Sequence, residues 1–151
     1  MPDCGPPTLL FLCTGNYYRS RFAEYLFNDR APARGLTWRA LSRALRISPR
    51  NIGPLSVHAR EELQRLGIEI EDPPRPPIPA REQDFSSSAR IIAMKEAEHR
   101  AMIEAEFPDW VERVQYWHID DLDCAEPHEA LPRLQRHVDA LLEQLAGETA
   151  N

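Results

Sequence analysis

Lysine is almost absent from this chain, which has 17 arginines but only one lysine, Lys95. The formal net charge is −6, which argues against a nucleic-acid-binding protein, because such proteins carry excess positive charge for the phosphate backbone. There is no run of about 18 apolar residues, so we expect no transmembrane helix. The first residues also lack the basic and long apolar segments of a signal peptide. The sequence therefore predicts a cytoplasmic protein without a membrane or nucleic-acid partner.

Cysteine is also scarce. The chain contains Cys4, Cys13 and Cys124, and an odd number without a C-x-x-C pair does not suggest a disulfide framework. The histidines show no spacing typical of a zinc site, so we expect no metal. With 42% apolar residues, the chain can bury a core without such crosslinks.

Short apolar runs and helical periodicities alternate along the chain. The expected strands are Thr8–Leu12, Thr37–Ser42, Ala89–Met94 and a segment within Val111–Ile119, and the expected helices cover about 20–28, 54–67 and 95–107 and begin again at 127. Strands that alternate with helices predict a parallel sheet covered on both faces. We therefore expect one α/β domain over residues 1–151, with three α/β/α layers around a four-stranded parallel sheet and with 1–6 and 147–151 flexible. The proline-dense segment Glu71–Pro79 is predicted to be a stiff surface connection.

The polar loop after the first strand carries the residues with reactive chemistry. Ligands bind beyond the carboxyl ends of parallel strands, and Cys13 stands at that end of the first strand. Gly15 and Asn16 suit a loop whose backbone N–H groups converge on an anion at the start of the next helix. Arg19 offers two planar donors to phosphate oxygens, and the Ser20 hydroxyl can reach the thiol. The same positive field favours the thiolate of Cys13, the form that attacks phosphorus.

An arginine six residues after a cysteine can arise by chance in a chain so rich in arginine. The alternative interpretation is a buried structural Cys13 beside a surface Arg19. The strand–loop–helix context, together with Gly15, Asn16 and Ser20, favours a phosphate-binding loop.

A cysteine phosphatase also needs an acid that protonates the leaving group. Only twelve residues precede Cys13, so we expect this acid downstream, in the segment Trp117–Asp123 that leaves the fourth strand at the same edge of the sheet. Asp120, Asp121 and Asp123 are the candidates. For each of them, the alternative is an ordinary loop or helix-capping aspartate.

The segment Thr8–Glu24 resembles the signature of the low-molecular-weight protein tyrosine phosphatases, which is Cys-x5-Arg-Ser/Thr close to the N-terminus. Ser42, at the end of the second strand, and the segments Ile91–Met94 and Trp117–Asp121 are also similar to that family. The resemblance implies a flavodoxin-like fold of the phosphotyrosine phosphatase I type.

Alignment of the Trp-x-Ile-x-Asp pattern places Asp121 at the position of the family's acid, followed by Leu122 instead of proline. Asp120 is the second choice and Asp123 the third. The resemblance implies a two-step reaction in which Cys13 attacks the phosphoester while Asp121 protonates the leaving group. Asp121 then activates the water that hydrolyses the phosphocysteine, and no cofactor is required.

The resemblance also implies supporting roles. Arg19 and the loop amides would hold the phosphate, and these amides belong to Thr14, Gly15, Asn16, Tyr17, Tyr18, Arg19 and Ser20. Asn16 and Ser42 would brace the loop, and Ser20 would stabilise the thiolate. The implied substrates are phosphorylated proteins, chiefly on tyrosine, or small phosphoesters.

Besides Leu122, several other positions depart from the family pattern. Tyr18 replaces a second cysteine, and Tyr17 replaces a smaller residue at the pocket wall. Arg21 replaces a proline, and we expect it to add charge near the pocket mouth. Arg50 falls near the place where an aromatic residue often flanks the substrate, and Lys95 stands where the family often has aspartate.

Alternative functions on the same scaffold follow from these departures. An arsenate reductase would need further cysteines to pass oxidation onward, and residues 14–123 contain none. A catalytically weak phosphate-binding regulatory module is a second alternative, which the altered acid loop favours. A phosphoarginine phosphatase is disfavoured, because those enzymes resemble a threonine at the position of Tyr17.

Overall fold

The computed structural model describes residues 5–122 and 124–150. The strands are β1 (Thr8–Cys13), β2 (Arg39–Ala44), β3 (Arg90–Ala93) and β4 (Gln115–Tyr116). The α-helices are α1 (Arg19–Arg30), α2 (Val57–Arg65), α3 (Glu82–Ser86), α4 (Glu96–Glu106) and α5 (Pro127–Ala150), and two short 3₁₀ turns cover Pro32–Arg34 and Pro108–Trp110.

The four strands form one parallel sheet in the order β2-β1-β3-β4, as the sequence predicts. Strand β1 lies inside the sheet, between β2 and β3. The chain therefore leaves β1 toward one side, by way of α1, and later crosses back to the other side to form β3. This reversal makes the carboxyl end of β1 the switch point of the sheet, where α/β proteins bind ligands.

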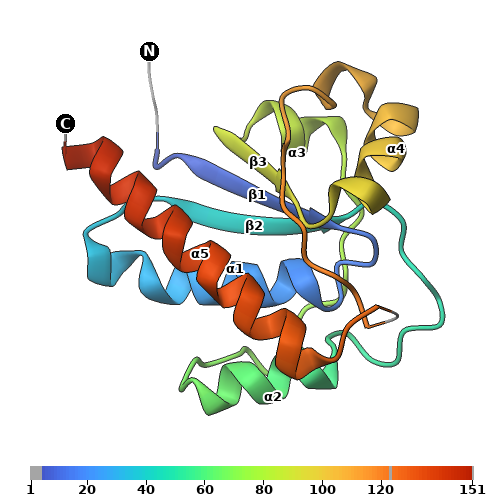
Figure 1. The fold of residues 1–151 in the computed structure, drawn as a ribbon, viewed down its shortest axis with the longest axis horizontal. Coiled ribbons are helices and arrows are strands. Elements are labelled where there is room, and N and C mark those ends of the chain that lie inside the picture. The colour runs from blue at the N-terminus through green and yellow to red at the C-terminus, as the bar shows by residue number, and fades with distance from the viewer. Residues whose placement is uncertain (1–4, 123, 151) are drawn as a thin grey trace.

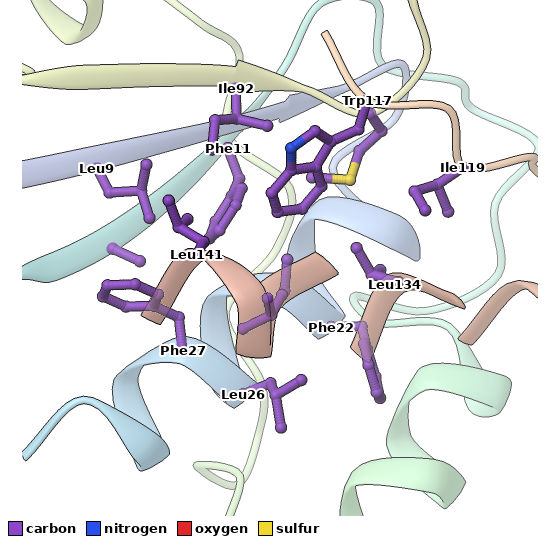
Figure 2. Packing of buried hydrophobic residues seen from close by; sticks show 14 of the residues in the cluster. Leu9, Phe11, Phe22, Leu26, Phe27, Ile92, Trp117, Ile119, Leu134 and Leu141 are labelled. Carbon is purple, nitrogen blue, oxygen red and sulfur yellow. The ribbon is translucent and has the colours of Figure 1, made fainter. Parts of the chain in front are cut away.

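Helices cover both faces of the sheet, with α1, α2 and α5 on one face and α3 and α4 on the other (Figure 1). The side chains of β1 alternate between the two layers: Leu9 and Phe11 belong to the core under α1 and α5, and Leu10 and Leu12 to the core under α3 and α4. Figure 2 shows the first of these cores, in which Phe11 lies opposite residues of α1 and α5. Burial on both faces explains why residues 9–12 of β1 are all apolar.

The helices differ from the sequence prediction mainly at their ends. Helix α2 begins at Val57 instead of Pro54, because the Ser56 side chain caps it by accepting a hydrogen bond from the His58 amide. Helix α5 continues to Ala150, and the flexibility that we expect from residue 147 stays a prediction. The sequence analysis also missed α3 and both 3₁₀ turns, which are too short to show a helical period. Although α5 is long, no helix within the described residues is apolar enough over a sufficient length to cross a membrane.

Candidate active site

The loop between β1 and α1 forms a cradle open to an anion. Cys13 ends the strand and Arg19 begins the helix. Asn16 has a left-handed backbone with φ of 51°, which its short polar side chain tolerates. Gly15 leaves room for the Asn51 amide, because a Cβ at this glycine would lie 3.0 Å from Asn51 Nδ2. No side chain caps the start of α1 and no acid lies in its first turn, so its positive end faces the loop.

A chain of hydrogen bonds holds the nucleophile candidate from inside. Cys13 Sγ lies 2.9 Å from Ser20 Oγ. Asn16 Nδ2 donates to Ser20 Oγ at 2.9 Å and to Ser42 Oγ at 2.8 Å. Because the Ser20 oxygen accepts from Asn16, its hydrogen is free to point at Cys13. The three residues that we expected to support the loop, Asn16, Ser20 and Ser42, therefore meet below Cys13 and are all buried.

The proline-dense connection supplies a further brace that the sequence analysis missed. Arg75 Nη1 donates to Asn16 Oδ1 at 3.1 Å, and Arg75 Nη2 donates to Glu24 Oε1 at 2.8 Å and Ser42 Oγ at 2.9 Å. The Ile78 amide also donates to Asn16 Oδ1, at 3.1 Å. The segment is thus more than a surface connection. In the sequence, the one feature that indicated this supporting role was an arginine inside a run of prolines.

Arg21 is not at the pocket mouth, and this expectation was wrong. Its side chain is buried and donates to the carbonyl oxygens of Pro54 and Arg75, both at 2.9 Å. Backbone carbonyls of two loops thus replace water around the guanidinium. Arg21 therefore ties the start of α1 to the loop before α2 and to the proline-dense segment.

Arg19 is held from behind by α4. Its side chain is 1% exposed. Its Nη1 donates to Glu98 Oε1 at 3.1 Å and to the Ile119 carbonyl at 3.0 Å, and its Nη2 donates to Glu98 Oε2 at 2.9 Å. Burial alone would raise the pKa of Glu98, but hydrogen bonds from His99, Arg19 and Thr14 hold it well below its usual range. The glutamate is therefore ionised and fixes the guanidinium in one orientation.

His99 completes this support. The Lys95 amide donates to His99 Nδ1 at 3.1 Å, so that the neutral ring carries its proton on Nε2. Nε2 lies 3.0 Å from Thr14 Oγ1 and 3.2 Å from Glu98 Oε2. The Thr14 hydroxyl in turn donates to Glu98 Oε2. Burial lowers the pKa of His99, although Glu98 opposes this shift. The sequence analysis did not single out Glu98 or His99; the signal was an acidic helix start directly after β3.

Asp120 and Asp121, two of the candidates for the catalytic acid, lie in different surroundings. Asp121 lines the pocket above Cys13, and its Oδ2 lies 3.4 Å from Arg19 Nη2. Asp120 instead lies 2.7 Å from Lys95 Nζ, and this contact lowers its pKa. Lys95 thus draws Asp120 away from the pocket. Asp123 lies outside the described residues.

The pocket itself has a volume of about 200 Å³. It is lined by Cys13, Gly15, Tyr17, Tyr18, Arg19, Asn51, Asp121 and Leu122. Tyr17 forms part of the wall and its hydroxyl donates to the Ile52 carbonyl at 2.5 Å. Arg50, which we expected beside the substrate, is exposed and Asn51 takes its place. A larger hollow of about 430 Å³ lies between α2 and α5, but no cysteine is among the described residues that line it.

The protein is thus of the α/β class, with a cysteine at the end of a parallel strand, a loop of amides and a buried arginine at the start of the following helix. A profile of the low molecular weight phosphotyrosine protein phosphatase family matches residues 8–151. The chain therefore belongs to this family. It is a cysteine-dependent hydrolase of phosphomonoesters.

Solved structures have the same fold. YfkJ from Bacillus subtilis is 23% identical, with a TM-score of 0.81 over 97% of this chain and 99% of that one. A low molecular weight protein tyrosine phosphatase from Bacillus subtilis, solved in solution, is 26% identical, with a TM-score of 0.72 over 93% and 95% of the two chains. The YwlE arginine phosphatase from Geobacillus stearothermophilus is 22% identical, with a TM-score of 0.71 over 96% and 94%. The comparison with curated proteins gave no significant match.

Proposed function

We propose that this phosphatase uses Cys13 as nucleophile, Arg19 as phosphate ligand and Asp121 as general acid and base. The observation that carries the proposal is the convergence of these three side chains on one small pocket at the start of α1. Cys13 ends β1, Arg19 begins α1 and Asp121 lies in the loop after β4. Proximity along the chain alone therefore does not explain why the three side chains line one pocket.

In the first step, the phosphoryl group of the substrate enters the loop. Arg19 and the amides from Thr14 to Ser20 donate to its oxygens. The Cys13 thiolate forms a bond to phosphorus while the bond to the ester oxygen breaks. The proton of Asp121 goes to that oxygen, so the substrate leaves as a neutral alcohol or phenol.

In the second step, the phosphocysteine is hydrolysed. The Asp121 carboxylate takes a proton from water, whose oxygen attacks phosphorus as the bond to sulfur breaks. Phosphate leaves, and the thiolate is restored next to the Ser20 hydroxyl, which lies 2.9 Å from the sulfur. Asp121 is then protonated again and can act as the acid in the next catalytic cycle.

The supporting residues keep these groups in place. The side chains of Asn16, Ser42 and Arg75 fix the curvature of the loop, because they form hydrogen bonds with each other. Glu98 fixes the orientation of Arg19. This positioning affects the rate, because a phosphate ligand that is displaced even slightly stabilises the transition state less.

For the substrate, we propose phosphorylated tyrosine side chains of proteins. The pocket mouth presents the ring of Tyr17 and the partly exposed Leu122, which suit the faces of a phenyl ring. Reduction of arsenate is not favoured, because Cys13 is the one described cysteine that lines the pocket.

The test is hydrolysis of p-nitrophenyl phosphate between pH 5 and 7 by the wild type and by Cys13→Ser, Asp121→Asn and Asp120→Asn. We expect no turnover by Cys13→Ser, a large loss of kcat in Asp121→Asn and near wild-type activity in Asp120→Asn. An inactive wild type, or full activity of Cys13→Ser, would refute the enzyme mechanism. Full activity of Asp121→Asn with loss in Asp120→Asn would move the acid to Asp120.

A further inference from the structure

Tyr18 presents an unusual buried hydroxyl in the wall of the pocket. The residue is 4% exposed, and its ring lines the pocket together with Cys13 and Asp121. Its hydroxyl oxygen is buried and has no hydrogen-bond partner among the described residues. Tyr18 precedes α1 as its N-cap, but its side chain does not cap the helix. A buried polar atom left without a partner costs free energy, so its place in a catalytic pocket calls for an explanation.

The hydroxyl is a permanent donor. Burial, and next the negative charge of Asp121, raise the pKa of Tyr18 to about 12, against an opposing effect of Arg19. The phenol therefore keeps its proton throughout the pH range of a phosphatase. Asp121 lines the same pocket as Tyr18, so the carboxylate and the phenol are neighbours in space.

Asp121 also has an ion-pair partner in the pocket. Its Oδ2 lies 3.4 Å from Arg19 Nη2, its Oδ1 accepts a hydrogen bond from the Leu122 amide at 2.9 Å, and its side chain is 39% exposed. A phosphoryl dianion that binds Arg19 competes for the same guanidinium and repels the carboxylate. Asp121 must then move from Arg19, and the Tyr18 hydroxyl is the buried donor in the pocket wall that still lacks an acceptor.

We propose that Tyr18 is a positioning residue whose hydroxyl donates a hydrogen bond to the Asp121 carboxylate when a phosphoryl group occupies Arg19. This inference rests on the proposed function of Asp121. The bond would hold Asp121 over the reacting phosphorus in both steps. The protonated acid of the first step can accept it through its carbonyl oxygen, and the carboxylate of the second step accepts it more strongly. Tyr18 thus takes no proton itself and acts through Asp121.

Other titratable groups also act on Asp121. Arg19 is its ion-pair partner, and His99 and Tyr18 interact with it electrostatically. The neighbouring Asp120 is paired with Lys95. None of these groups except Tyr18 is altered by Tyr18→Phe, so a shift caused by this substitution can be assigned to the hydroxyl.

The first experiment needs no turnover. The carboxyl carbon of Asp121 is titrated by NMR with and without saturating inorganic phosphate, in the wild type, Tyr18→Phe and Tyr116→Phe. With phosphate, we expect Asp121 in Tyr18→Phe to titrate about one pH unit higher than in the wild type, because the ionised form has lost its donor. Without phosphate, the two should titrate alike. Equal titrations with phosphate, or the same difference without it, would overturn the proposal.

Tyr116→Phe is the matched control, because it also removes a partly buried phenol hydroxyl, which donates to the Val111 carbonyl outside the pocket. It should leave the titration of Asp121 unchanged. A check that needs no variant is the Tyr18 Cζ resonance of the wild type. It should move when phosphate binds, because the hydroxyl gains an acceptor, and an unmoved resonance would count against the inference.

Kinetics give the independent readout. Where the second step limits turnover, kcat rises as Asp121 ionises, so Tyr18→Phe should shift the acidic limb of kcat to higher pH by a similar amount. A purely structural effect would lower kcat/KM without moving this limb. Loss of activity in Cys13→Ser tests the proposed function separately, so that the two can fail independently.

Discussion

Arg19 and Glu98 form a two-point ion pair across the site, with Nη1 to Oε1 at 3.1 Å and Nη2 to Oε2 at 2.9 Å. The pair joins the start of α1 to the start of α4, which lie 79 residues apart. Lys95 stands where the family often has aspartate, and Glu98, one turn along the same segment, supplies the negative charge near the arginine. Arg19 is thereby oriented before any substrate arrives.

Glu98→Gln should lower kcat/KM by roughly 10- to 100-fold, the effect of losing one charged hydrogen bond. The amide group of glutamine must turn an N–H toward Arg19, which offers only donors. The matched control is Glu96→Gln, in the first turn of the same helix, where the glutamate pairs with exposed Arg100. Kinetics with p-nitrophenyl phosphate measure both. A wild-type kcat/KM in Glu98→Gln would show that Arg19 needs no such support.

Arg75→Met should destabilise the fold and slow the reaction. The substitution leaves the half-buried Glu24 without its counter-ion and removes donors from Asn16 and Ser42, which we expect to cost about 2 kcal/mol. Urea unfolding should show a lower midpoint with an unchanged slope. Arg65→Met, which breaks an exposed pair with Glu62, is the control and should leave the midpoint unchanged.

The strand–loop–helix arrangement around Cys13 was predictable because one contiguous stretch contains all of its local information. The apolar run before Cys13 indicates a strand, and the helical period after Ser20 indicates a helix. Asn16 and Gly15 mark the turn between them. The parallel sheet followed from the alternation of elements along the chain, which needs no knowledge of contacts between distant residues.

The braces around the loop were not predictable in this way. Glu98 and Arg75 reach the loop only after α4 and the proline-dense segment have packed, across 79 and 59 residues of chain from their respective partners Arg19 and Asn16. In sequence, each looks like an ordinary solvated charge. The predicted position of Arg21 was wrong for the same reason, since the carbonyl groups that accept its hydrogen bonds come from two distant loops.

His99 should make stability depend on pH. Burial lowers its pKa in the folded protein from the ordinary value of 6.5, so between the two values the unfolded chain binds more protons. Stability should therefore fall as pH drops below about 6.5 toward the folded pKa. Urea unfolding at pH 7.5 and pH 5 measures this, and the difference should shrink in His99→Gln. His58→Gln, at an exposed site, should keep the wild-type difference. An equal difference in all three proteins would exclude His99 as the source.

Gly15→Ala should weaken substrate binding through Asn51. The new Cβ would lie 3.0 Å from Asn51 Nδ2, closer than side chains normally approach, and the amide must shift within a pocket of only about 200 Å³. We expect KM for p-nitrophenyl phosphate to rise roughly fivefold, equivalent to about 1 kcal/mol of lost binding. Gly147→Ala is the matched control, because a Cβ there meets no atom within 4 Å.

The double variant separates crowding from backbone effects. If the loss arises from contact with Asn51, adding Asn51→Ala to Gly15→Ala should recover most of the affinity, since the two side chains are in contact and their effects do not add. Asn51→Ala alone gives the reference for this cycle. Strict additivity of the two changes in KM would mean that Gly15 is needed for its backbone and not for the space that it leaves to Asn51.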